Sequence, residues 1–189
     1  MMRPARALFI LALVVSTIVE VTIVRFTWPI EYGRDDHIPD RADAIVVFYG
    51  EDSRRDRALE MARDGVAPVV VLSLGQKYRT VGFVCGQTTP FTVMCPTPSM
   101  DDTESEMRMF ASMIEQRSWN EVVAITNTYH KQRAQLLMKS CIERDIPIAT
   151  TTNSWRRPIG VVRDELLKYF YLRLRPVKCA PDSGITQDL

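Results

Sequence analysis

The sequence predicts an α/β three-layer sandwich with a mostly parallel sheet, preceded by one N-terminal transmembrane or signal-anchor helix. Short, continuously apolar runs of strand length alternate along the chain with amphipathic segments of helix length. Continuous apolar runs are typical of strands buried on both faces, as in a parallel sheet. Because the strand–helix order repeats four times, helices are expected to cover both faces of that sheet. A long uncharged stretch near the N-terminus predicts the additional helix.

Length and composition limit the classes of function. With 189 residues the chain is long enough for one domain with a substantial core but not for two. Lys and Arg total 24 against 23 Asp and Glu, a net charge of +1 that argues against a general nucleic-acid-binding surface. Only two histidines occur, and the common zinc spacings Cys-x-x-Cys and His-Glu-x-x-His are absent. We therefore predict no metal ligands.

Residues 1–30 are expected to lie outside the α/β domain, as an anchor or a signal segment. Arg3 and Arg6 precede an uncharged run, and within residues 7–24 only Glu20 carries a charge. These 18 positions are enough for a short membrane span, which needs roughly 17–25 apolar residues. The alternative is a cleaved signal peptide, but residues 17–25 contain no Ala-x-Ala cleavage pattern. We favour an uncleaved single-pass anchor, with the N-terminus in the cytoplasm and the domain outside the cell membrane.

The remaining chain divides into a linker, a domain and a tail. Residues 31–41 form the linker, 42–176 the α/β domain and 177–189 the tail. Within the domain we predict strands over 44–49, 68–73, 121–126 and 146–152, the last being more polar and so nearer an edge. Helices are predicted over 53–64, 101–117, 129–144 and 159–174. Residues 76–100 form a long irregular insertion with three prolines and two cysteines, typical of a functional or disulfide-pinned loop.

The four cysteines are consistent with an oxidising compartment. They allow three pairings, and we predict the local one, Cys85 with Cys95 and Cys141 with Cys179. The alternative is four free, buried cysteines, as is normal in the cytoplasm.

The candidate site lies at the carboxyl ends of the strands. In an open parallel sheet, ligands bind in the crevice beyond these ends, where the strand order reverses. The rule selects residues at the end of each strand: Gly50, Glu51, Asp52 and Arg54 after the first, Ser73, Gly75 and Gln76 after the second, and residues 126–130 after the third. The third strand leads straight into a helix, whose N-terminus suits an anion. His130 and Arg133, three residues apart, share a face there. A solvated arginine and a structural histidine are the alternatives.

Two common reaction types lack their signatures. No Gly-x-Gly-x-x-Gly follows the first strand, which disfavours a dinucleotide cofactor. No Gly-x-Ser-x-Gly elbow occurs, so Ser73 is a weak candidate for a nucleophile.

Three segments resemble the YdcF-like proteins, a group that includes the bacterial envelope proteins SanA and ElyC. They are residues 42–47 (ADAIVV), 57–73 (RALEMARDGVAPVVVLS) and 125–134 (ITNTYHKQRA), with Thr103-x-x-Glu106 between the last two. The resemblance covers about residues 43–174 and is most specific at Tyr-His-x-x-Arg-Ala. It implies a Rossmann-like fold and a role in cell-envelope or peptidoglycan biogenesis and integrity. A cytoplasmic relative is associated with S-adenosylmethionine, which we discount for an extracytoplasmic domain.

The resemblance also implies a single pocket, with residues matched one by one. It would be lined by Asp43, Arg57, Ser73, Thr103, Glu106, Thr126, His130 and Arg133. The chain departs from the family pattern after its first two strands, where it has one glycine, Gly50, and then Ser73-Leu-Gly75. Both changes leave less room for backbone to approach a ligand, so the ligand is expected to differ.

Two functions follow from these residues. In the first, the domain acts on a phosphorylated or lipid-linked envelope precursor as a phosphate-ester or pyrophosphate hydrolase or transferase. Its phosphate is bound by Gly50, Arg57, Ser73, Gly75, Thr103, Thr126, Asn127 and Arg133, with His130 as acid or base and Glu106 orienting it or activating water. A magnesium ion shared with the phosphate is compatible with this function. In the second, the same pocket serves a non-catalytic ligand-binding or scaffold protein. The basic helix at 159–174 packs on the sheet or contacts anionic lipid.

Overall fold

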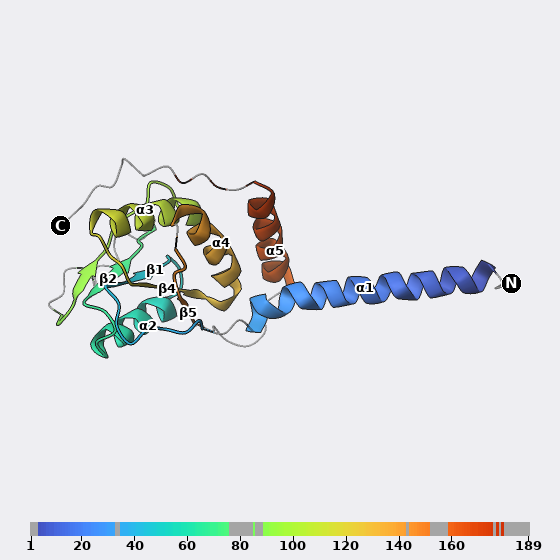
Figure 1. The fold of residues 1–189 in the computed structure, drawn as a ribbon, viewed down its shortest axis with the longest axis horizontal. Coiled ribbons are helices and arrows are strands. Elements are labelled where there is room, and N and C mark those ends of the chain that lie inside the picture. The colour runs from blue at the N-terminus through green and yellow to red at the C-terminus, as the bar shows by residue number, and fades with distance from the viewer. Residues whose placement is uncertain are drawn as a thin grey trace.

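The computed structural model describes residues 4–32, 35–75, 85, 89–142, 144–151, 159–175, 177 and 179, and within them a single five-stranded parallel sheet (Figure 1). The sheet order is β3-β2-β1-β4-β5. All neighbouring strands pair in parallel. The strands are β1 (Ala44–Val47), β2 (Val69–Leu72), β3 (Thr92–Met94), β4 (Val122–Asn127) and β5 (Ile148–Thr151). The predicted parallel α/β architecture is therefore confirmed, and the more polar strand β5 lies at an edge.

Helices cover both faces of the sheet. On one face α2 (Asp52–Arg63) packs over β1, β2 and β4. On the other face α3 (Thr103–Gln116) and α4 (Lys131–Cys141) enclose a second apolar cluster. The predicted methionine-rich face of α3 lies in that cluster, with Met107, Met109 and Phe110 fully buried. A short 3₁₀ turn, η2 (Thr128–His130), links β4 to α4, and α5 (Ile159–Leu174) packs beside α4.

Two local features differ from the sequence prediction. Strand β3 lies within the segment predicted to be irregular, where only three residues pair with β2. A strand of this length at a sheet edge gives no apolar run to detect. The helix predicted from residue 129 begins only at Lys131, because residues 128–130 form the 3₁₀ turn. Asp102 caps α3 by accepting a hydrogen bond from the Ser105 amide at 2.7 Å.

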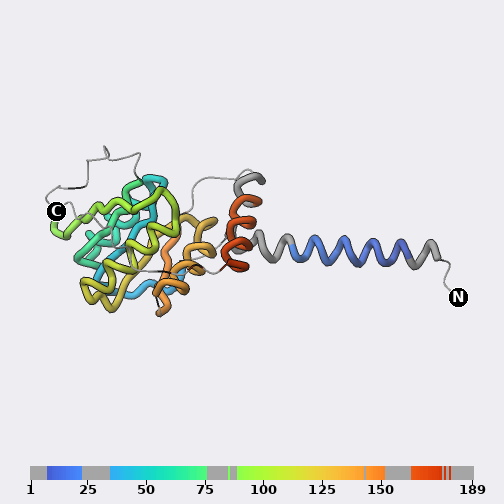
Figure 2. The backbone as a smooth tube through the Cα atoms, turned by 90° about the horizontal axis from the view of Figure 1, so that it is seen from above, coloured from blue at the N-terminus to red at the C-terminus, as the bar shows by residue number. Residues whose placement is uncertain are grey.

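The N-terminal helix α1 (Pro4–Tyr32) extends away from the α/β domain (Figures 1 and 2). Its C-terminal end lies beside η2 and α5 (Figure 1). Its apolar side chains from Leu8 to Val21 are exposed, none of them less than 48%. Among the described residues, no helix meets the length and apolar character required of a membrane span.

Both predicted disulfides are present. Cys85 is bonded to Cys95 and Cys141 to Cys179, with Cα–Cα separations of 6.0 and 5.0 Å. The first joins a residue of the predicted insertion to the chain just after β3. The second joins the C-terminal end of α4 to a residue beyond α5. Residues 76–84 and 86–88 of the predicted insertion and most of the predicted tail lie outside the described residues.

The order of the strands fixes where a ligand crevice can form. From β1 the chain moves outward through β2 to β3, and then crosses to β4 on the other side of β1. The reversal therefore lies between β1 and β4, whose carboxyl ends are at residues 48–50 and 127–130. The sequence-predicted crevice residues from these two strands lie there.

Candidate functional site

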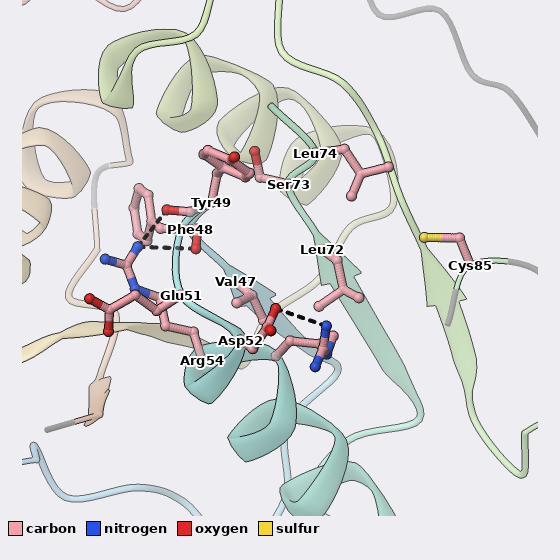
Figure 3. Close-up of a pocket in the computed structure, with 12 residues that line it drawn as sticks. Val47, Phe48, Tyr49, Glu51, Asp52, Arg54, Leu72, Ser73, Leu74 and Cys85 are labelled. Atoms are coloured by element: carbon pink, nitrogen blue, oxygen red, sulfur yellow. Dashed lines mark hydrogen bonds and ion pairs between the residues drawn. The ribbon is translucent and has the colours of Figure 1, made fainter. Parts of the chain in front are cut away.

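A cavity of about 450 Å³ lies at the carboxyl end of β1. It is lined by the turn from β1 into α2, the end of β2 and Cys85 (Figure 3). Gly50 and Ser73, both predicted as ligand-binding residues, belong to its wall. The buried charge in that wall is Arg54, from the first turn of α2.

Arg54 is only 3% exposed, and neutral oxygens hold its guanidinium. Its Nε donates to Asn127 Oδ1 at 2.8 Å. Its Nη1 donates to the carbonyl oxygens of Phe48 and Tyr49 at 3.2 and 2.6 Å (Figure 3). Burial lowers the pKa of Arg54, but a guanidinium stays charged at neutral pH. The side chain is thus a buried cation hydrogen-bonded to neutral oxygens, and the nearby charges of Glu106 and Glu51 offset part of the cost of burying it.

Gly50 is shaped by this arginine. Its φ is +150°, and a Cβ at this position would lie 2.8 Å from the Arg54 Cζ. Glycine alone both adopts this backbone conformation and leaves room for the guanidinium. The group that closely approaches the Gly50 backbone is therefore the Arg54 guanidinium, a side chain of the protein itself.

Asn127 links the two strand ends. It is fully buried, and its Oδ1 accepts hydrogen bonds from Arg54 and from the Thr151 hydroxyl, both at 2.8 Å. Its Nδ2 donates to the Tyr129 hydroxyl at 3.0 Å. All of its partners belong to the protein, so Asn127 positions Arg54 and Tyr129.

Glu106, from α3, forms the negative side of this region. It is 6% exposed, and one carboxylate oxygen accepts the Tyr49 amide hydrogen at 2.6 Å. Burial raises the pKa of Glu106, although the Ser73 hydroxyl, the Tyr49 amide and the charges of Arg54 and Arg133 oppose the rise. Ser73 Oγ is buried and lacks a partner with hydrogen-bonding geometry among the described residues. The Ser73 hydroxyl is nevertheless close enough to Glu106 to lower the pKa of that carboxyl.

A second group of polar side chains surrounds Arg133, at the start of α4. Its Nε donates to Glu165 Oε2 at 3.0 Å and its Nη1 donates to Thr103 Oγ1 at 2.7 Å. Glu165 comes from α5, is 4% exposed, and also contacts Lys168 Nζ through its Oε1 at 3.2 Å. His130 Nδ1 lies 3.1 Å from Glu165 Oε2 and 2.7 Å from Arg133 Nη2.

The pKa values of Glu165 and His130 are both lowered, by different causes. Burial would raise the pKa of Glu165, but the hydrogen bond to His130 and the charges of His130, Arg133 and Lys168 prevail and lower it to about 2. Burial lowers the pKa of His130, against the opposing effect of Glu165. At neutral pH the pair is therefore an ionised carboxylate and an uncharged imidazole. Nδ1 can either accept from Arg133 or donate to Glu165, but not both, so the proton's position selects the partner.

The structure brings most of the predicted site residues together, in two groups. Gly50 and Ser73 lie with Arg54 and Asn127, whereas Thr103, His130 and Arg133 surround Glu165. Glu106 couples the groups, because the charges of Arg54 and Arg133 both act on its carboxyl. Gly75 packs against the Tyr49 ring, where an added Cβ would lie 3.0 Å from it.

Three predicted positions lie elsewhere. Arg57 is on the outer side of α2, with its side chain 43% exposed and paired with Glu60 at 3.1 Å. Asp43 precedes β1, at the amino ends of the strands and thus away from the cavity. Its carboxylate accepts the amide hydrogens of Asn120 and Glu121. These hydrogen bonds lower its pKa. Thr126 is buried within β4, in register with Thr150.

Sequence reasoning placed Arg54 among the crevice residues after the first strand but gave it no binding or catalytic role, and it assigned no site role to Glu165. Arg54 carries a signal, because it lies four residues before Ala58 and therefore on the buried face of α2. Glu165 lies on the face of α5 that includes Leu172 and packs toward α4. The structure replaces Glu106 with Glu165 as the carboxylate that contacts His130.

No group of three His, Cys, Asp or Glu side chains within the described ranges is close enough to hold a metal ion. Comparison with known proteins returned no matching family model, no matching curated protein and no matching solved structure. The resemblance to the YdcF-like family remains a prediction.

Proposed function

We propose that the protein is a membrane-anchored, extracytoplasmic member of the YdcF-like group that binds a phosphorylated cell-envelope precursor or lipid carrier and transfers or hydrolyses its phosphate. The observation that supports it is Arg54, a buried cation in a cavity wall that is held by neutral oxygens. The charges of Glu106 and Glu51 already act on Arg54, and an anionic ligand in the cavity would add a further opposite charge beside the guanidinium. Phosphate oxygens suit a guanidinium because its planar N–H groups donate in pairs.

The second group supplies the acid–base chemistry of this proposal. His130 is uncharged at neutral pH and can take a proton from water or from an attacking hydroxyl. Glu165 then stabilises the imidazolium, because its pKa of about 2 keeps the carboxylate ionised. Glu106, whose pKa is raised, is the group suited to donate a proton to a leaving oxygen.

The proposed compartment rests on two supports. The disulfides Cys85–Cys95 and Cys141–Cys179 are typical of an oxidising compartment. The exposed apolar side chains of α1 would be covered in a lipid environment, with residues 1–3 and their arginine on the cytoplasmic side.

A non-catalytic ligand-binding protein is the second candidate. The buried Ser73 hydroxyl favours it, because this oxygen has almost no accessible surface from which to attack a ligand. Under this candidate Arg54 binds the same anion, and the His130 group reports or stabilises the bound state.

A ligand panel tests the proposal. The full chain, purified in detergent under oxidising conditions, is melted in the presence of pyrophosphate, nucleotide sugars and short-chain polyprenyl phosphates. A ligand at one hundred times its Kd stabilises the protein by about 2.7 kcal/mol, which raises the melting temperature. We expect a shift with a phosphorylated envelope compound that is lost in Arg54→Gln.

Arg57→Gln is the matched control, because it removes the same charge one turn further along α2 from a position paired with Glu60. It should leave the ligand shift unchanged. Turnover of the bound compound, lost in His130→Ala, supports the enzyme; binding without turnover supports the second candidate. If no phosphorylated compound shifts the wild type, both forms of the proposal fail.

A further inference from the structure

Helix α5 presents an apolar surface to the outside of the domain. Leu167, Phe170, Tyr171 and Leu174 are 62%, 44%, 58% and 85% exposed. Their spacings of three, one and three residues place them on one side of the helix, within an arc of about 100°. We call this surface the α5 outer face. The opposite side carries Glu165, which is buried against His130 and Arg133, and Leu172, which packs against the apolar core.

Basic residues border the α5 outer face. Helical geometry places Lys168 and Arg175 along one border and Arg173 along the other, with Arg163 at the N-terminal end. Asp164 pairs with Arg163, and it is the exposed acid among residues 163–175. An apolar strip bordered by cations is the pattern of a helix that lies in the interface of an anionic membrane, where long cationic side chains reach the headgroups.

The placement of α5 in the fold agrees with this pattern. In both views α5 runs across the direction of α1 (Figures 1 and 2). Its inner side contacts α4, and it lies on the side of the domain from which α1 extends (Figure 1). A bilayer around the exposed apolar side chains of α1 would therefore run parallel to α5 and meet its outer face.

We propose that the α5 outer face docks on the surface of an anionic lipid bilayer. The occupant is a bilayer because this helix side has both an apolar strip and cationic borders. It also lies next to a second helix whose apolar residues from Leu8 to Val21 are exposed. This inference rests on the membrane location in the proposed function, but not on the phosphate chemistry. The docked helix carries Glu165, so the His130 group would lie just above the headgroups.

Site-directed spin labelling of the full chain tests the docking. All the described cysteines are in disulfides, so a single introduced thiol can take the nitroxide. The label is placed at Leu174→Cys in the α5 outer face or at Glu60→Cys, an exposed position on α2 beyond the far face of the sheet. Protein reconstituted in anionic or zwitterionic vesicles is then exposed to a water-soluble nickel quencher and to oxygen. In anionic vesicles we expect the label at 174 to be shielded from nickel and accessible to oxygen, with the reverse at 60.

Removal of single positive charges measures how much each arginine contributes to docking. Each of the substitutions Arg173→Gln and Arg175→Gln should lower the ratio of docked to undocked label roughly fivefold, since a cation near an anionic surface contributes about that factor. Equal nickel accessibility at 174 and 60 in anionic vesicles would overturn the proposal. Label–label broadening at 174 that disappears on dilution with unlabelled protein would also overturn it, by assigning the face to a second copy of the chain.

A third label separates this inference from the proposed function. Val14→Cys reports on α1 alone, so a water-exposed label there with a shielded label at 174 would contradict the anchor while supporting docking. Failure of the phosphate panel with a shielded label at 174 would contradict only the ligand chemistry.

Discussion

Arg54 and Arg133 both lie at the carboxyl ends of the strands, yet their guanidinium groups have different kinds of hydrogen-bond partner. Arg54 is held by two carbonyls and an amide oxygen, whereas Arg133 is held by the carboxylate of Glu165. The partners of Arg54 belong to the β1–α2 turn and β4. The partners of Arg133 come from α3 and α5, outside the sheet.

The difference separates binding from positioning. Arg54 lines the cavity and its hydrogen bonds go to neutral oxygens, so we assign it the anion-binding role in the proposed site. A cation already paired with a carboxylate has less charge to offer, so Arg133 mainly positions Glu165 and His130. Disrupting one group at a time should therefore produce different defects.

The largest expected effect comes from removing the Cys141–Cys179 disulfide, which ties the chain beyond α5 to α4. Loop-closure entropy for its separation of 38 residues predicts a loss of about 4 kcal/mol in the free energy of unfolding for Cys141→Ser with Cys179→Ser. Urea unfolding measures it. The matched double variant, Cys85→Ser with Cys95→Ser, removes a disulfide that joins residues 10 apart. It should lower the free energy of unfolding by about 3 kcal/mol. A smaller loss of stability on removal of the Cys141–Cys179 disulfide than on removal of Cys85–Cys95 would contradict this expectation.

Substitution of Gly50 should damage the Arg54 group selectively. In Gly50→Ala the new methyl would meet the guanidinium and the backbone would be strained, at roughly 1–3 kcal/mol in stability. Titration calorimetry with the ligand found in the panel should show weakened binding. Gly65→Ala is the control, because its φ is also positive, at +84°, but its Cβ would meet no atom within 4 Å. If Gly65→Ala weakens binding as much, displacement of Arg54 is not the cause.

The smallest expected effect is the pH dependence from Glu165. Its pKa is lowered from 4.5 to about 2, so its ionised form stabilises the fold above pH 4.5, and this contribution is lost as the pH falls toward 2. In Glu165→Gln that loss should disappear, a difference of about 1–2 kcal/mol after allowance for screening. Acid unfolding followed by circular dichroism measures it. Identical acid profiles would show that the carboxylate contributes nothing.

The same substitution changes His130. Glu165 opposes the lowering of the His130 pKa by burial, so Glu165→Gln should lower that pKa further. Titration of the imidazole by NMR reports the shift directly, and Lys168→Gln serves as a control that leaves the His130 contact in place.

The sequence predicted the strands that form the crevice, because continuous apolar runs such as residues 44–47 and 122–125 mark strands buried on both faces. It also placed His130 and Arg133 on one face through their spacing. It missed β3, whose three residues pair at an edge. Arg57 was preferred to Arg54 through the family resemblance, although helical spacing puts Arg54 on the buried side of α2. Glu165 could not be predicted, because nothing local indicates which groups α5 packs against.

The chain order of the two groups has a consequence for how the protein matures. Every strand and the whole Arg54 group precede residue 152, whereas Glu165 and Cys179 follow the last strand. A nascent chain can therefore complete its sheet and its cation while His130 still lacks a carboxylate partner. That partner arrives with α5, and the chain beyond α5 is attached by the packing of Val177 against the core and by the Cys141–Cys179 disulfide. The protein thus completes its acid–base pair after its sheet, once α5 has packed against α4.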